Sequence, residues 1–131
     1  WYTHDEEVYY ATSTNGINWT VYGKVFEGNA SYDQYGIKDA VVIKDQLYEM
    51  FYVADSGDER GEHDYLAHAY SPDGIIWIKH SANPFIRIGK EGKFDEKGLS
   101  EPVLLKNKNN YTLRYAGIDA QNNRRIGMAM S

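Results

Sequence analysis

The chain has 131 residues, 42% hydrophobic and 25% charged, which is the composition of one globular domain with its own core. A formal net charge of −5 argues against a nucleic-acid partner and against an anionic membrane, since both would call for a basic face. The chain has no cysteine and no stretch near the roughly 18 apolar residues of a membrane span, which excludes a disulfide framework, a thiolate metal site and a spanning helix.

Extended segments rich in Val, Ile, Tyr, Phe and Thr follow one another along the chain, and no window shows the 3.6-residue periodicity of a helix. We therefore predict an all-β fold made of antiparallel strands. Trp1 and Tyr2 end the first of these extended segments. The other predicted strands lie near 8–13, 19–26, 40–44, 47–54, 64–71, 76–80, 102–106, 110–117 and 123–131.

One short motif, S-x-[ND]-G-I-x-W, recurs between predicted strands. It occupies residues 13–19 and 71–77, and a third copy begins at Ser131. Asn-Gly and Asp-Gly pairs favour tight hairpin turns, and the Trp opens the strand that follows. We interpret the motif as structural, a turn followed by a core anchor.

A second repeat is longer and carries acidic residues. Residues 33–43 read DQYGIKDAVVI, and roughly 60 residues later 95–105 read DEKGLSEPVLL. Each copy places a carboxylate, Asp39 or Glu101, immediately before a short apolar run typical of a buried strand. An internal repeat of this length indicates a repeat architecture.

Four antiparallel strands in roughly 60 residues are typical of a β-propeller blade, and closed propellers have about four to eight blades. We expect one domain over 1–131 of about two blades, with the connections 27–38 and 81–100 lying over one mouth. The expected divisions are a partial blade with its connection at 1–38, a full blade at 39–100 and an incomplete blade at 101–131. Either the chain is a piece of a longer protein, or copies associate as a dimer or trimer to cover the open edges.

Together, the pattern [FY]-D-x-x-G-[IL]-x-[DE]-[AP]-V, a Y-x-x-x-Y strand and S-x-[ND]-G-I-x-W resemble the five-bladed propeller glycosidases. This superfamily includes the arabinanase and β-xylosidase group, the invertase and levanase group and mannoside phosphorylase-like proteins. The resemblance implies that successive blades contribute a base or nucleophile, an assisting aspartate and a glutamate acid. By position, Asp39 is similar to the aspartate and Glu101 to the acid. Ala40 stands where the family usually has Pro, and the blade with the base would lie upstream of Trp1, so the resemblance implies an incomplete active site in this chain.

The chemistry of glycoside hydrolysis makes this acidic pair interesting by itself. It needs two carboxyl groups, roughly 5 to 5.5 Å apart for retention or 6.5 to 9.5 Å apart for inversion. Residues at equivalent positions of adjacent blades both approach the axis, so we expect Asp39 and Glu101 to be near neighbours. Burial and mutual repulsion would then raise the pKa of one of them, as a general acid requires. The alternative is that both side chains only accept backbone N–H groups at strand starts.

Aromatic side chains are the candidates for sugar contacts. Tyr2, Tyr52 and Tyr115 fall at one repeat position, and Arg114 precedes the last of them. A sugar ring could stack on such residues, although packing between blades is the commoner use.

Metal and cofactor motifs are missing from the sequence. The acidic stretch 55–64 does not fit a calcium loop, and His4, His63, His68 and His80 lack zinc spacing. We therefore expect no metal and no cofactor. The sequence leaves the compartment unknown, and the resemblance gives only a slight preference for an extracellular or periplasmic bacterial setting.

The two functional hypotheses differ in whether the chain does chemistry. The first is a carbohydrate-active protein of the glycoside hydrolase type, with Glu101 as general acid and Asp39 as assisting carboxylate. The second is a non-catalytic propeller fragment that binds a sugar or a protein partner. A third carboxylate in the funnel, from upstream sequence or from another copy, would distinguish them.

Overall fold

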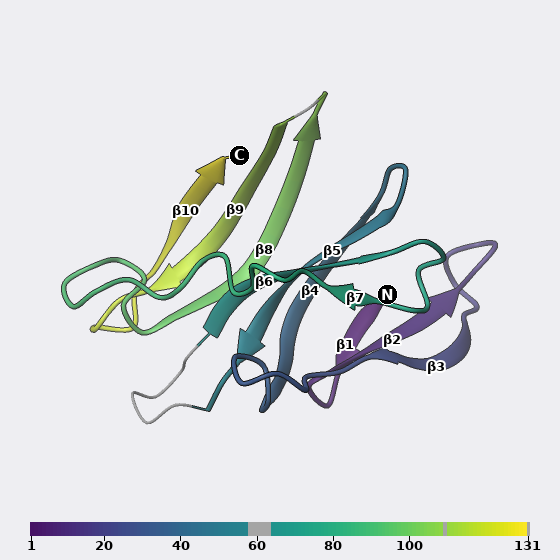
Figure 1. The fold of residues 1–131 in the computed structure, drawn as a ribbon, viewed down its shortest axis with the longest axis horizontal. Helices are drawn as coiled ribbons and strands as arrows, with labels where there is room; N and C mark the ends of the chain where they lie inside the picture. The colour runs from purple at the N-terminus through teal and green to yellow at the C-terminus, as the bar shows by residue number, and fades with distance from the viewer. Residues whose placement is uncertain (58–63, 109, 131) are drawn as a thin grey trace.

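A computed structural model describes residues 1–57, 64–108 and 110–130 of the chain. In these ranges every regular element is a β-strand, which confirms the predicted all-β fold. Three antiparallel sheets lie side by side (Figure 1). No helix long and apolar enough to cross a membrane occurs in the part of the chain that is described.

Each sheet is built from strands that follow one another in the sequence. The first sheet has the order β1 (Tyr2–His4), β2 (Glu7–Thr12), β3 (Thr20–Phe26). The second has the order β4 (Gly36–Lys44), β5 (Tyr48–Asp55), β6 (Asp64–Ser71), β7 (Ile78–Lys79). The third contains β8 (Gly98–Asn107), β9 (Asn110–Ile118) and β10 (Arg124–Met130), with β9 in the middle. The second sheet is thus the four-stranded unit expected of a propeller blade, and the whole is consistent with about two blades.

Several strand boundaries differ from the prediction; β1, for example, continues to His4 rather than ending at Tyr2. β4 and β8 begin at Gly36 and Gly98, ahead of the apolar runs, because backbone pairing with β5 and β9 continues past those runs. Asp39 and Glu101 therefore lie inside strands rather than before them. β7 is shorter than predicted, because the residues ahead of it belong to a turn.

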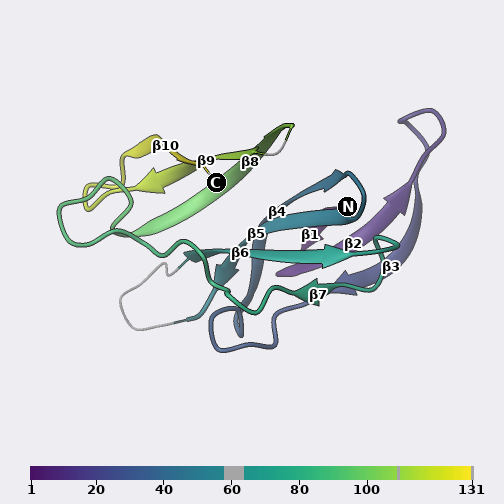
Figure 2. The ribbon, with the colours of Figure 1, turned by 45° about the horizontal axis from the view of Figure 1, so that its top comes forward.

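The side chains of the second sheet alternate between two cores. Tyr52 and Ala54 are buried against the first sheet with Val8 and Phe26. Val53, on the opposite face of β5, is buried against the third sheet. The second sheet therefore lies between the other two, as Figure 2 shows from a second direction.

The S-x-[ND]-G motifs form the expected turns. In the second sheet, Ser71 Oγ accepts the N–H of Gly74 at 2.8 Å, and Asp73 Oδ1 accepts the N–H of Ile75 at 2.8 Å. Ser13 and Asn15 accept the equivalent bonds in the first sheet. Gly16 and Gly74 both have positive φ, 73° and 78°, a conformation that glycine adopts without strain.

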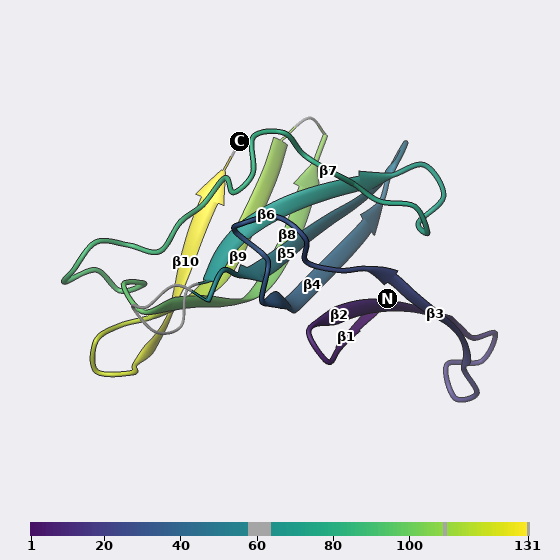
Figure 3. The same ribbon diagram turned by 60° about the horizontal axis from the view of Figure 1, so that its bottom comes forward.

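The tryptophans that follow these turns have different environments. Trp77 packs into the core between the first and second sheets, as a core anchor should. Trp19 is 59% exposed, on the turn that projects from the first sheet (Figure 3). The same motif thus anchors a core only where a neighbouring sheet is available to cover it.

Candidate functional site

Asp39 and Glu101 occupy equivalent bulges on neighbouring strands. β4 lies against β8, and the register of each strand shifts at these positions, between Ile37 and Asp39 and between Ser100 and Val103. A bulge bends its strand and re-aims a side chain. Glu101 also has a φ of 53°, which is uncommon for a residue with a Cβ and is found more often at functional sites.

The structure brings these two residues into direct contact. The backbone N–H of Glu101 donates a hydrogen bond of 3.0 Å to Asp39 Oδ2. The contact joins a backbone amide to a carboxylate. It is therefore the bond expected if Asp39 only accepts a backbone N–H group, without a role in catalysis. The burial expected to prepare a general acid is not found at Glu101, because its side chain is 68% exposed and its carboxylate is accessible from solvent.

Arg124 is a member of this group that no sequence motif marks. It begins β10, and its Nη1 lies 3.3 Å from Glu101 Oε1 and 3.3 Å from Ser100 Oγ. Arg124 reaches Glu101 from a strand that is not adjacent to β8 in the sheet. Only the spatial arrangement identifies it, because its spacing in the sequence follows no catalytic pattern.

Two of the candidate sugar-binding tyrosines are core residues. Tyr52 is fully buried and Tyr115 is 9% exposed, in separate cores. Their hydroxyls each donate a hydrogen bond of 3.2 Å, to Asp33 and to Asp95 respectively. Burial is the main cause that raises the pKa of both hydroxyls above the ordinary value. Neither side chain has a free face on which a sugar ring could stack. Both tyrosines instead pack between sheets, which is the commoner use of such residues.

The other two candidates lie apart from these cores. Tyr2 is 42% exposed on β1 and stacks on Tyr9, with ring centroids 5.7 Å apart. Arg114 is exposed on β9, next to Tyr115 in the sequence. The structure therefore does not gather the four candidates on one surface around Asp39 and Glu101.

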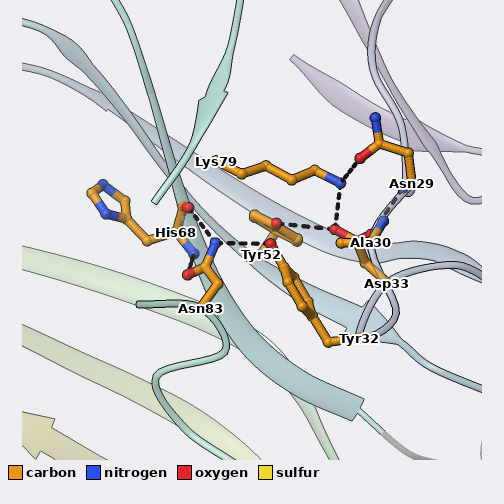
Figure 4. Close-up of polar contacts among 8 residues, drawn as sticks. All are labelled: Asn29, Ala30, Tyr32, Asp33, Tyr52, His68, Lys79 and Asn83. Atoms are coloured by element: carbon orange, nitrogen blue, oxygen red, sulfur yellow. Dashed lines mark hydrogen bonds and ion pairs between the residues drawn. The ribbon is translucent and has the colours of Figure 1, made fainter. Parts of the chain in front are cut away.

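A buried carboxylate fixes the connection that leads into β4. Asp33 Oδ1 accepts the backbone N–H groups of Asn29 and Ala30 at 2.9 and 2.7 Å. Its Oδ2 accepts the Tyr52 hydroxyl and lies 2.6 Å from Lys79 Nζ (Figure 4). With four donors, the charge is well compensated despite its burial. This network holds the connection in place ahead of the strand that carries Asp39.

No metal site is evident in the part of the chain that the structure describes. Within 1–57, 64–108 and 110–130, no three His, Cys, Asp or Glu side chains gather in a way that could hold an ion. Most of the acidic stretch considered as a calcium loop, with His63, lies outside the described residues.

Comparison with solved structures identifies the fold. A family 117 glycoside hydrolase produced by the marine bacterium Zobellia galactanivorans matches 95% of this chain at 23% identity and a TM-score of 0.78, over 38% of its own length. A protein described as a glycoside hydrolase matches 92% of the chain at 24% identity and a TM-score of 0.73, over 34% of its length. Sucrose-6-phosphate hydrolase from Lactobacillus gasseri matches 95% of the chain at 16% identity and a TM-score of 0.75, over 25% of its length.

Comparison at the level of sequence adds no further relative. No protein-family model matches the chain, and no curated protein matches it. The resemblance to propeller glycosidases inferred from the motifs is confirmed at the level of fold. The chain has the fold of propeller-type glycoside hydrolases, and it spans 25% to 38% of the length of the structures that it resembles.

Proposed function

We propose that this chain acts on carbohydrate as a part of a propeller glycoside hydrolase site. Glu101 serves as the general acid that protonates the leaving oxygen, and Asp39 serves as the assisting carboxylate. The observation that carries the proposal is the placement of two carboxylate residues at equivalent bulges of adjacent sheets, close enough for the Glu101 N–H to donate to Asp39 Oδ2. Glycoside hydrolysis depends on carboxyl groups held at a short and defined separation.

The assignment of roles follows from the two environments. Asp39 is half-buried and accepts a backbone N–H, which holds its carboxylate in a fixed position beside Glu101. Glu101 is exposed, so its carboxyl group can reach a glycosidic oxygen that approaches from solvent. Its pairing with Arg124 would have to open for it to donate a proton. The base or nucleophile would come from a further sheet of the same type.

A second candidate function is a non-catalytic module that binds sugar or protein. Two observations support it. Glu101 is paired with Arg124 rather than free to donate a proton, and the buried Tyr52 and Tyr115 pack in the cores. Under this alternative, glycan binding would occur without turnover and without a need for an ionisable group at position 101.

The experiment compares leaving groups. The chain and its Glu101→Gln variant are assayed with aryl arabinofuranosides, aryl xylosides and sucrose 6-phosphate, with Glu91→Gln as the control for loss of an exposed carboxylate. A general acid contributes about 10²- to 10⁴-fold. We expect Glu101→Gln to lose activity on that scale with a phenyl leaving group, and much less with dinitrophenyl, which departs without protonation.

Two results would decide against the acid role. An equal loss with both leaving groups, with an unchanged unfolding midpoint, would show that Glu101 does not protonate the leaving oxygen. Glycan binding measured by calorimetry that is equal in the unmodified chain and in Glu101→Gln, without turnover by either, would favour the non-catalytic module.

A further inference from the structure

An apolar hollow of about 520 Å³ lies between the second and third sheets. It opens beside β10, and its wall combines aromatic and aliphatic side chains with the Glu49 carboxylate. The residues that line it include Glu49, Phe51, Ile86, Tyr111, Leu113 and Ala129.

At the other interface, between the first and second sheets, a tryptophan fills the corresponding space. The ring centroid of Trp77 lies 6.3 Å from that of Trp1 and 6.5 Å from that of Phe26. Trp1 in turn lies 5.3 Å from Tyr48. Trp77 reaches this space because β7 pairs with β6 and brings the indole in at the edge of the sheet.

The wall of the hollow repeats the residues around Trp77. Tyr48 lies opposite Lys44 as Tyr111 lies opposite Lys106. Phe26 lies opposite Val8 as Ile86 lies opposite Leu66. Trp1 precedes Tyr2 as Phe51 precedes Tyr52. The hollow is therefore lined by the counterparts of Trp1 and Phe26, which contact the partly buried Trp77, and of Tyr48, which contacts Trp1. No indole is among the residues that line the hollow.

The strand edge beside the hollow, that of β10, is also uncovered among the residues that the structure describes. Within the described ranges, β10 pairs with β9 alone and stands at the outer edge of the third sheet (Figure 3). The equivalent edge of β6 is covered by β7, through Ala69 opposite Lys79 and Tyr70 opposite Ile78. An uncovered strand edge offers backbone N–H and C=O groups to an added strand.

We propose that the hollow and the edge of β10 together bind an extended peptide segment of the S-x-[ND]-G-I-x-W type, with its backbone paired to β10 and its tryptophan in the hollow. The aromatic wall gives the indole the edge and face contacts that such rings prefer. Glu49 accepts from Tyr111 at 3.4 Å and lies 2.6 Å from His68 Nε2, so a carboxylate stands at the wall where an indole N–H could donate. This inference does not depend on glycoside hydrolysis.

The test is a binding measurement with a peptide taken from the chain itself. The probe is SPDGIIWIKH, the sequence of residues 71–80, carrying 5-fluorotryptophan and observed by ¹⁹F NMR with the full chain. We expect a saturable shift of the fluorine signal. Unlabelled peptide should displace the probe, and a peptide with Ala in place of Trp should bind at least about thirtyfold more weakly, as for an anchor tryptophan.

Two variants locate the binding site. Ala129→Arg places a long side chain in the hollow from a partly exposed position and should abolish binding. Val103→Arg lies on the opposite, exposed face of the third sheet and should bind the peptide as the unmodified chain does. Circular dichroism of both variants checks that the sheets remain folded.

Three results would overturn the proposal. They are the absence of a saturable shift, equal binding of the Ala peptide, and unchanged binding by folded Ala129→Arg. If instead the chain self-associates and Ala129→Arg alone makes it monomeric while the peptide does not compete, the occupant is a second copy and not a segment of this type.

Discussion

The Tyr52 hydroxyl donates a hydrogen bond of 3.2 Å to Asp33, a fully buried carboxylate on the connection into β4. The same bond recurs in the third sheet, where the Tyr115 hydroxyl donates to Asp95 at 3.2 Å. In each case a tyrosine of the sheet's second strand holds the connection that enters its first strand. These bonds connect the cores to the part of each sheet that carries Asp39 or Glu101.

Tyr52→Phe should lower the free energy of unfolding by about 1–3 kcal/mol, because Asp33 stays buried and loses one of its donors while the ring remains. Urea unfolding measures the change. Tyr35→Phe is the matched control, since this ring is largely exposed, and we expect it to change stability by less than about 0.5 kcal/mol. Equal effects of the two substitutions would remove the Tyr52–Asp33 bond from the account of stability.

Gly74→Ala should be more destabilising than Gly16→Ala, although both glycines have similar positive φ. A Cβ at Gly74 would lie 2.6 Å from Trp1 Cζ2, whereas a Cβ at Gly16 would meet nothing within 4 Å. Both variants carry the backbone strain of about 1 kcal/mol, and only Gly74→Ala adds the clash. We expect the difference in their thermal unfolding midpoints to vanish when Trp1 is replaced by Ala in both.

Stability should fall as the pH is lowered below about 6.5. Burial lowers the pKa of His68 from its ordinary value, which outweighs the opposite effect of Glu49, and His80 lowers it further. The unfolded chain then binds more protons than the folded one between the folded and unfolded pKa values, so the free energy of unfolding decreases as the pH falls across that window.

His68→Gln should flatten this dependence. His4→Gln, at an exposed side chain, serves as the control and should leave it unchanged. Unfolding midpoints measured from about pH 7.5 to about pH 5.5 test the prediction, about one unit either side of an ordinary histidine pKa. If His68→Gln leaves the slope of stability against pH unchanged, the dependence comes from other titratable groups.

Asp39→Asn and Asp39→Ala should have different effects on stability. The Asn amide oxygen can still accept the N–H of Glu101, whereas Ala leaves that N–H without this acceptor. We expect Asp39→Ala to be less stable than Asp39→Asn by about 0.5–1.5 kcal/mol. If Asp39 is the assisting carboxylate, both variants should lose glycosidase activity, since both lack the charge. An Asn variant with full activity would leave Asp39 only the structural role.

The solution mass of the 15.0 kDa chain should be that of a dimer or trimer. Exposed apolar side chains on the outer face of the third sheet form the kind of surface that marks association. They are Val103, Leu105, Ile126 and Met128. Met128→Lys should shift light scattering toward the monomer. A monomer at every concentration tested would contradict the prediction and leave the proposed site without a third carboxylate from another copy.

The sequence by itself determined the features that depend on neighbours within a few residues. The turn at Ser71, Asp73 and Gly74 follows from hydrogen bonds across two or three residues and from the freedom of one glycine. The strand content follows from runs of β-branched and aromatic residues. The resemblance of these motifs to propeller glycosidases was sufficient to predict the fold.

The tertiary structure alone decided which side chains are buried and which groups meet. Trp19 and Trp77 follow the same motif, but only Trp77 has a neighbouring sheet to cover it. Tyr52 and Tyr115 are core residues because neighbouring sheets pack on their rings, and buried aspartates accept their hydroxyls. The contact of Asp39 with Glu101 and the approach of Arg124 depend on sheet packing and on backbone bulges. Such long-range contacts leave no periodic trace in the chain, because their energy depends on surfaces brought together only when the sheets pack.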